Sequence, residues 1–484
     1  MSTAAAASPA TSLLRPATLT TTNNRVHLNN LEHLFRNRGS ATIETAPPPQ
    51  PAAKKQATAA PLLRLPSFLG RGRSDEHHQN VSPRRLERVL LPAAADGPSP
   101  RGNIAATWRD LHGEGQWRGL LDPLHPDLRR EIVRYGEFVD AAYSAFLSHP
   151  DASPADSAVT VNTTSTYRVT APLFATSSVT LPSWVASASP CAAQRTSLVG
   201  YVAVCESPSE LRRMGRRDIV VALRGTCTVL EWAENIRADL VPAVAAGENT
   251  IASGQNAGGT TPKVECGFWN LYKTRAGAAA ASLSESVVSE IRRLIAKYDG
   301  EELSITITGH SLGAALAILI ADELSAGIPN PPPIAVFSFG GPRVGDVAFA
   351  ERVERGGARV LRVVNAHDVV PRFPPRRSYA DVGSELRLDS RASPYLRPDA
   401  DVACCHDLEA YIHLVDGFLG SHCPFRANAK RSILRLLQNQ GGNVKQLYIR
   451  KALDMRARLD AGDMSVSSAS PLGRRRRAGV EVTA

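Results

Sequence analysis

Long apolar runs, cysteine pairs and early acidic residues are all missing from this chain of 484 residues. No stretch approaches the about 18 consecutive apolar residues that a membrane-spanning helix needs, so no such helix is expected. Seven cysteines without a Cys-x-x-Cys pair make no disulfide framework, and a reducing compartment is the default. Hydrophobic residues still make up 43% of the chain, which excludes wholesale disorder and leaves material for a sizeable core.

The absence of Asp and Glu before Glu32 sets the N-terminal segment apart. Residues 1–22 are rich in Ala, Ser and Thr, carry Arg15, and lack the continuous apolar core of a secretory signal. An acid-poor, hydroxylated and Arg-bearing start is typical of an organelle transit peptide, which we place at residues 1–45. The plastid is the expected destination, with the mitochondrion and a generic disordered terminus as the alternatives.

Two further segments have compositions that do not favour folding. Residues 46–106 are Pro-rich and basic without apolar periodicity, and are predicted to be a disordered linker. Residues 462–484 combine a Ser-rich run with the adjacent arginines Arg474–Arg477, and are predicted to be a disordered tail with the charge to dock on anionic lipid. One folded domain is therefore expected between them, over residues 107–461.

Within that domain, helical and strand patterns alternate along the chain. From residue 218 onward, short β-rich runs are separated by stretches of helical periodicity, which is typical of βαβ units. This pattern predicts the α/β class, with a mostly parallel central sheet flanked by helices. The predicted strands are 218–223, 303–308, 334–339 and 360–365, and the predicted helices are 128–146, 283–298, 314–325, 347–353, 407–418, 429–438 and 444–459.

The strongest chemical signal is the segment Gly309–Gly313, which has the sequence GHSLG. The β-rich LSITIT precedes it and the helical AALAILIADEL follows it, which is the strand–turn–helix context of a nucleophile elbow. Such a turn strains the serine backbone and presents the Ser311 hydroxyl above the sheet, at a helix N-terminus whose partial charge favours an oxyanion. We expect Ser311 to be a nucleophile and His310 to shape the motif; a Gly-rich turn without chemistry is the alternative.

A nucleophilic serine needs a base and an acid that orients the base, and in this type of site the acid and then the histidine follow the serine. Asp368 comes after the β-rich run VLRVVN, at the edge where active sites of open sheets lie, and is the best acid candidate. Asp346 competes with it, although its position before a predicted helix favours an N-cap. His406, at the start of HDLEAYIHLVDGF, is favoured as the base over His413 and His422.

The oxyanion of such a reaction needs hydrogen-bond donors. The backbone N–H of Leu312, directly after the serine, is one of them. The segment Arg224–Thr226 ends the predicted strand 218–223, and Thr226 can offer a backbone N–H and a hydroxyl, with a simple turn as the alternative. This chemistry needs no metal, and the pairs His77-His78 and Cys404-Cys405 lack the spacing of metal ligands.

Several ordered motifs resemble the class 3 lipase family, the group of fungal triacylglycerol lipases and plant phospholipases. They are RGT (224–226) with Trp232 and Asn235, VECGFWNLY (264–272), GHSLGAALA (309–317), FGGPRVGD (339–346) and NAHDVVPRFP (365–374). Residues 117–146 and 406–418 are most similar to the plastid-type (class I) phospholipase A1 enzymes of plants. The resemblance implies the α/β-hydrolase fold, a triad of Ser311, Asp368 and His406, and Thr226 as an oxyanion donor.

The resemblance also implies an activity and a substrate. Such an enzyme releases a fatty acid from the sn-1 position of phosphatidylcholine, often also from galactolipids or triacylglycerol, and in plants can feed linolenic acid into jasmonate synthesis. A galactolipase or triacylglycerol lipase is the alternative among enzymes, and a non-catalytic lipid-binding protein of the lipase fold is the alternative outside them. No cofactor is expected.

The expected partner is a glycerolipid at a membrane surface, reached without a spanning helix. The net charge of +10 belongs partly to the terminal segments, which removes the argument for nucleic acid, and what remains suits docking on an anionic lipid surface. Residues 241–262, where the family has its lid, are rich in Gly, Ala and Asn, so a short and loose lid is expected.

Overall fold

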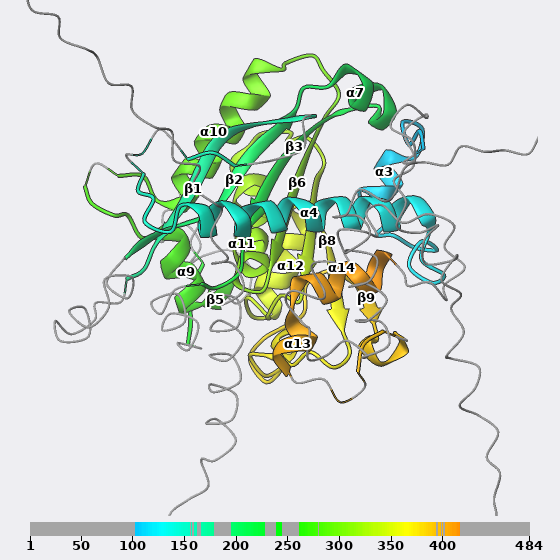
Figure 1. The fold of residues 1–484 in the computed structure, drawn as a ribbon. Helices are drawn as coiled ribbons and strands as arrows, with labels where there is room; N and C mark the ends of the chain where they lie inside the picture. Colours follow the sequence, from blue (N-terminus) through cyan, green and yellow to red (C-terminus); the bar gives the residue numbers. More distant parts are fainter. Residues whose placement is uncertain are drawn as a thin grey trace, which may run out of the picture.

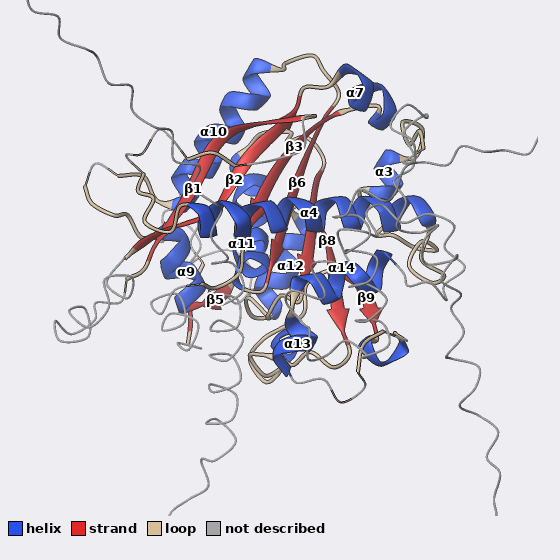
Figure 2. Cartoon of the chain, viewed as in Figure 1, coloured by secondary structure: helices blue, strands red, loops and turns tan. Residues whose placement is uncertain are grey.

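The computed structural model describes residues 102–416, apart from residues 155, 157–158, 162–165, 179–194, 228–238, 244–260, 279, 394, 398 and 400–401. A twisted sheet lies between two layers of helices, and α4 (Pro126–Ser148) crosses one face of the sheet in the view of Figure 1. Figure 2 shows the strands in the middle and the helices to either side. The predicted α/β class is therefore confirmed.

The central sheet has seven strands in the order β1-β2-β3-β6-β7-β8-β9. The strands from β3 to β9 run parallel, whereas β1, β2 and β3 pair antiparallel at one edge. This is the mostly parallel sheet that the alternating pattern predicts and that the family resemblance implies for an α/β-hydrolase fold. The strands are β1 (Tyr167–Thr176), β2 (Thr196–Cys205), β3 (Arg217–Leu223), β6 (Leu303–His310), β7 (Ile334–Phe339), β8 (Arg359–Asn365) and β9 (Ser384–Leu388). A separate two-stranded ribbon joins β4 (Leu240–Pro242) to β5 (Lys263–Glu265).

Helices cover both faces of the sheet and divide the core in two. Side chains of α3, α4 and α14 share one apolar cluster with the sheet, and side chains of α9, α10, α11 and α12 share the other. The remaining helices lie in connections. Their bounds are α3 (Trp108–Leu111), α7 (Pro208–Met214), α9 (Cys266–Lys273), α10 (Leu283–Lys297), α11 (Leu312–Gly327), α12 (Val347–Arg355), α13 (Val402–His406), α14 (Leu408–Asp416), and the 3-10 turns η1 (Val370–Arg372) and η2 (Ser390–Ala392).

The helix behind the nucleophile is apolar on nearly all sides. Residues Leu312–Ala321 of α11 are all buried, because this helix packs on the sheet and is covered in turn by α9, α10 and α12. By contrast, α10 is amphipathic and begins at a capping box in which Ser282 and Glu285 satisfy each other's backbone N–H groups. The buried α11 therefore gives the segment before it a rigid support.

The predicted elements that fall on described residues are confirmed within a few residues at each end. The helix predicted at 128–146 is α4, the one predicted at 314–325 is α11, and the strand predicted at 303–308 is β6. The sequence reasoning missed β1, β2, β9 and α9. The helices predicted at 429–438 and 444–459 lie outside the described residues, as do residues 244–260 of the expected lid. Within the described residues, no helix has the length and apolar character to cross a membrane.

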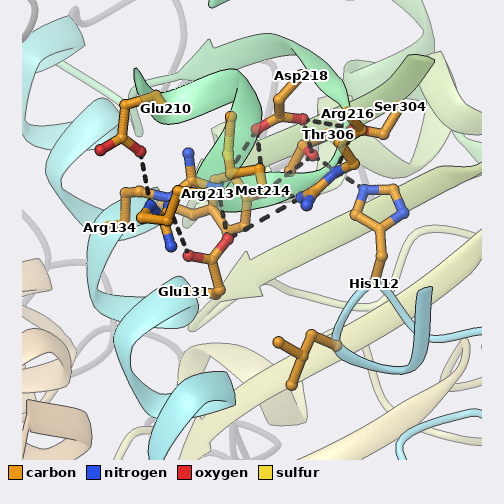
Figure 3. A network of polar contacts seen from close by, with 12 residues as sticks. His112, Glu131, Arg134, Glu210, Arg213, Met214, Arg216, Asp218, Ser304 and Thr306 are labelled. Carbon is orange, nitrogen blue, oxygen red and sulfur yellow. Dashed lines mark hydrogen bonds and ion pairs between the residues drawn. The ribbon is translucent and has the colours of Figure 1, made fainter. Parts of the chain in front are cut away.

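A buried ion network joins α4 and α7 to the sheet at the start of β3 and β6 (Figure 3). Its charged members are three acidic residues and three arginines, and hydroxyl groups and one histidine lie beside them. The ionic side chains are Glu131, Arg134, Glu210, Arg213, Arg216 and Asp218. His112 lies beside them, with its Nε2 3.0 Å from Thr306 Oγ1, and Thr306 in turn donates to Asp218 at 2.7 Å. The network sits at the opposite end of β6 from the GHSLG turn.

Candidate active site

Ser311 stands at the turn between the end of β6 and the start of α11. Its backbone has φ = 56°, a left-handed conformation that non-glycine residues rarely adopt, and its N–H donates to Phe339 O at 3.0 Å. Gly313 packs so closely on the end of β3 that a Cβ there would lie 2.4 Å from the Arg224 carbonyl oxygen. Strand, strained serine and close helix packing are the geometry that the GHSLG pattern predicts.

Three side chains from distant parts of the chain meet at this turn. His406, the last residue of α13, places its Nε2 2.9 Å from Ser311 Oγ and its Nδ1 2.7 Å from Asp368 Oδ2. Asp368 follows β8 and is 1% exposed, His406 is 1% exposed, and Ser311 is only partly buried. Because a carboxylate only accepts, the hydrogen of the neutral imidazole lies on Nδ1, and the bare Nε2 accepts the Ser311 hydroxyl hydrogen.

The carboxylate of Asp368 is held by donors on both oxygens. Val370 N–H donates to Oδ1 at 2.9 Å, while the hydroxyl of Tyr411 donates to Oδ2 at 2.6 Å. Burial, together with the nearby charge of Asp368, raises the pKa of Tyr411 well above its ordinary value, so this hydroxyl remains a donor. The orientation of the acid is therefore fixed independently of His406. The sequence reasoning missed Tyr411, although it lies within the segment HDLEAYIHLVDGF.

The competing acid and bases lie elsewhere. Asp346 caps α12, accepting from Phe349 N at 2.8 Å, as its position in the sequence favours. His413 is buried with its Nε2 2.9 Å from Ser393 Oγ. His422 lies outside the described residues. Among the candidates that fall on described residues, the structure brings together Ser311, His406 and Asp368, which the sequence reasoning favoured.

The expected oxyanion side is formed by the end of β3. Leu223 pairs with Gly309 across the parallel strands, so the residues after β3 lie beside the nucleophile turn. A Cβ on Gly225 would lie 3.0 Å from Ser311 Cβ, which shows how closely this loop approaches the serine. Thr226 follows and is 1% exposed. Trp232 and Asn235, the other family residues of this region, lie outside the described residues.

Arg224 anchors this loop from below. Its guanidinium is buried and donates to Leu198 O and to Gly225 O, both at 2.7 Å, and it lies 4.1 Å from the centre of the Phe146 ring. The N–H of Leu312 lies in the first turn of α11, where backbone donors have no acceptor within the helix. A polarised hydroxyl, an oriented imidazole and donors near the serine are together suited to acyl transfer.

Sequence comparisons relate the chain to a lipase family and to plant proteins named phospholipase A1. Residues 220–378 match the family model described as lipase (class 3). The chloroplastic phospholipase A(1) DAD1 of Arabidopsis thaliana is 42% identical over 70% of this chain and 83% of its own length. Phospholipase A1-Igamma2, chloroplastic, from the same plant is 39% identical over 65% of this chain and 66% of its own length.

A rice relative and a solved structure extend the comparison. Phospholipase A1-II 6 of Oryza sativa subsp. japonica is 39% identical over 68% of this chain and 85% of its own length. A lipase from Rhizopus microsporus var. chinensis aligns with a TM-score of 0.37 at 20% identity, covering 55% of this chain and 75% of that chain. At this TM-score the structural similarity supports no further conclusion.

Proposed function

The chain belongs to the class 3 lipase family and is an ester hydrolase, and on that premise we propose that it is a phospholipase A1 that cleaves the sn-1 acyl ester of glycerolipids. The observation that carries the proposal is the hydrogen-bonded series of Ser311, His406 and Asp368 at 2.9 and 2.7 Å. The names of the relatives support the A1 assignment, since the plant proteins with 38–42% identity are phospholipases A1.

In the proposed mechanism, His406 takes the proton of Ser311 as the serine oxygen attacks the ester carbonyl. Asp368 stabilises the imidazolium that forms and keeps Nδ1 as the protonated nitrogen. His406 then gives the proton to the leaving lysolipid, and the acyl group stays on Ser311. Water repeats the cycle with His406 as base and releases the fatty acid, so no other residue needs to change its protonation state.

The negative charge of each tetrahedral intermediate needs donors that are already in place. We assign this role to the N–H of Leu312 at the start of α11 and to Thr226 at the end of β3. Preorganised donors of this kind are worth about 10²–10³ in kcat each. The helix N-terminus adds a favourable partial charge at the same point.

The names of the relatives support a location, whereas the head group of the substrate rests on the resemblance to plastid-type phospholipases A1. Phosphatidylcholine at a membrane surface is the proposed substrate, and galactolipids and triacylglycerol are the competing ones. The chloroplastic names of the first relatives support a plastid location and give no support to the mitochondrial alternative. A role in jasmonate synthesis stays a prediction, and it requires that linolenic acid be released from plastid lipids.

The test is hydrolysis of position-labelled lipids by the full chain. Phosphatidylcholine labelled at sn-1 or at sn-2, monogalactosyldiacylglycerol and triacylglycerol are compared, with Ser311→Ala as the blank. We expect release mainly from the sn-1 position and no release by the variant. Release mainly from sn-2 would overturn the A1 assignment, and faster turnover of galactolipid or triacylglycerol would replace the substrate. No ester hydrolysis above the blank would favour the non-catalytic lipid-binding alternative.

A further inference from the structure

A second series of hydrogen bonds lies beside the catalytic one. Its two side chains, those of His310 and Tyr143, have no role in the proposed mechanism. His310 Nε2 lies 2.7 Å from the backbone carbonyl oxygen of His406, and His310 Nδ1 lies 2.8 Å from the hydroxyl of Tyr143. The same Tyr143 hydroxyl oxygen is 2.8 Å from the N–H of Gly225. The series therefore connects the backbone of the proposed base with the backbone of the oxyanion loop. We call it the His310–Tyr143 bridge.

The direction of each hydrogen bond in the bridge follows from its ends. The carbonyl of His406 only accepts, so His310 donates through Nε2–H, and the neutral ring then has a bare Nδ1. That nitrogen accepts the hydroxyl hydrogen of Tyr143. The N–H of Gly225 only donates, so it occupies a lone pair of the Tyr143 oxygen. All donors thus point the same way, from Gly225 to His406, and one tautomer of His310 satisfies every partner.

In the bridge His310 is buried and Tyr143 is partly buried, and the two side chains come from separate elements. His310 ends β6 and is 3% exposed, and Tyr143 comes from the last turns of α4. Burial is the largest cause, and the nearby Cys227 the second, of a pKa of Tyr143 well above its ordinary value. The tyrosine therefore stays a neutral donor. The rings of His310 and His406 also pack against each other in a tilted arrangement, with centroids 4.7 Å apart at 32°. Ring packing and hydrogen bond therefore act on the same base.

Both ends of the bridge lie where small displacements matter for catalysis. His406 must keep Nε2 within reach of Ser311 Oγ and then of the leaving oxygen. Gly225 precedes Thr226, and a Cβ at Gly225 would lie 2.4 Å from the Tyr143 hydroxyl, so the loop rests directly on that group. A displacement of about 1 Å in such a site can cost about 100-fold in rate.

We propose that Tyr143 and His310 are positioning residues that hold the base and the oxyanion loop at a fixed distance from each other around Ser311. The inference rests on the proposed function, because it assigns the bridge to the same acyl transfer. Neither side chain contacts the reacting atoms in this role. Losing the bridge should lower kcat, whereas KM, which reflects how the acyl chain and head group are bound, should change little.

The first test compares two Tyr→Phe variants that each remove one hydroxyl from the interface of α4 with the sheet. Tyr143→Phe removes the bridge. Tyr201→Phe is the matched control, since its buried hydroxyl donates to the Phe138 carbonyl of α4 at 2.9 Å, away from the site. We expect a roughly 10- to 100-fold loss of kcat for Tyr143→Phe with KM unchanged, and wild-type kcat for Tyr201→Phe. Equal kcat in both variants would overturn the proposal.

The second test asks whether the two residues act as one unit. His310→Phe removes both polar contacts of the histidine, while His310→Gln keeps an N–H that can reach the His406 carbonyl and should recover part of kcat. The double variant Tyr143→Phe/His310→Phe should be about as slow as the slower single variant, because one bridge can be broken only once. Losses that multiply in the double variant would show independent structural effects and would overturn the bridge.

The substrate of both tests is a soluble activated ester such as p-nitrophenyl butyrate, with Ser311→Ala as the blank. Turnover of this ester needs the catalytic machinery but no lipid recognition. If the wild-type protein cleaves the ester but no glycerolipid, the phospholipase assignment is wrong, and the effect of the bridge on ester turnover can still be measured. Wild-type protein that fails on the ester as well would sink both, since no acyl transfer would remain to be positioned.

Discussion

Thr226 is the residue whose assigned role depends most on one atom. Valine keeps nearly the same shape but lacks the hydroxyl, so Thr226→Val should lower kcat by about 10²–10³ with KM nearly unchanged. Thr226→Ser keeps the hydroxyl and should retain most of the activity. Steady-state kinetics on a soluble ester measures both variants. If Thr226→Val keeps the wild-type kcat, the hydroxyl is not an oxyanion donor and only the backbone N–H groups remain.

Single residues could be predicted from the sequence where a local pattern marks them. Ser311 stands inside GHSLG, and Asp368 stands directly after a strand, so both follow from neighbouring residues. The choice between His406 and His413 rested on position alone. The two histidines lie seven residues apart on one segment, and that spacing would put both on a similar face of a helix. In the structure, His413 is buried and its Nε2 lies 2.9 Å from Ser393 Oγ instead of contacting the triad serine.

Tyr143 and Tyr411 show why the rest of the site could not be predicted. Tyr143 meets His310 across 167 positions of the chain, and Tyr411 meets Asp368 across 43. No spacing rule links residues so far apart, since their contact depends on how α4 and α14 cross the sheet. On a predicted helix, a tyrosine of this kind looks like any other core residue.

At the scale of elements, α11 crosses the end of β3 in very close contact beside the site. In Gly313→Ala, the new Cβ would lie 2.4 and 2.6 Å from the backbone oxygens of Arg224 and Leu223, which no side-chain rotation can relieve. We expect a loss of about 1–3 kcal/mol in the free energy of unfolding, together with a fall in kcat as the serine turn shifts. Denaturant unfolding and ester kinetics measure the two effects.

Gly277 provides the control for this substitution. A Cβ at Gly277 would meet nothing within 4 Å, and the φ of this residue lies outside the positive range that side chains disfavour. Gly277→Ala should therefore leave both the free energy of unfolding and kcat close to wild type. A Gly313→Ala variant as stable and active as Gly277→Ala would mean that α11 can move away from β3 without harm.

Elements were predictable where the hydrophobic period was regular. The run LSITIT and the apolar α11 stand out in the sequence, and both are confirmed as β6 and α11. In contrast, β1 contains Pro172 and β2 contains Gly200, residues that count against a strand when read locally. Gly200 is explained only by its neighbour, because a Cβ there would lie 2.0 Å from the Ala222 carbonyl oxygen of β3.

At the scale of the whole molecule, the positive charge lies away from the described fold. Residues 102–416 contain 30 Lys and Arg against 36 Asp and Glu, so this part is net negative although the whole chain is +10. Residues 417–461, which belong to the predicted domain, add 9 Lys and Arg against 2 Asp and Glu, so the expectation that the charge outside the terminal segments suits docking on anionic lipid stays a prediction. The net positive charge that would attract the protein to such a surface lies in residues 1–101 and 417–484.

Arg474–Arg477 offer the sharpest test of that attraction. An arginine near an anionic surface contributes about 1 kcal/mol, so replacing the four by alanine should weaken binding to phosphatidylglycerol vesicles strongly, and the difference should shrink at high salt. Replacement of the same four by lysine is the control, because it keeps the charge. Hydrolysis of a soluble ester should be the same in all three proteins. Vesicle binding that does not change with alanine would place the docking elsewhere.

The buried ion network links the stability of the whole fold to pH through His112. Burial, helped by the charge of Arg216, lowers the pKa of His112 to about 3, so this histidine is neutral in the folded protein. Asp218, Glu131 and Arg134 face the same ring, and Asp218 remains ionised because Arg216 and Arg134 outweigh the cost of its burial and lower its pKa to about 2. Neither group therefore changes charge in the folded state above about pH 4.

The unfolded chain behaves differently, since its free histidine takes up a proton below about pH 6.5. Between pH 6.5 and about 3 the unfolded state binds one more proton at His112 than the folded state, so stability falls as the pH drops, by up to about 1.4 kcal/mol per pH unit. Asp218 adds to this fall only below about pH 4, because its ordinary pKa is 3.8.

In His112→Gln the amide can still reach Thr306 but does not titrate. The free energy of unfolding, measured with urea from pH 7.5 to 4.5, should therefore depend less steeply on pH in His112→Gln than in the wild type. Equal slopes in the two proteins would mean that other groups cause the loss of stability in acid.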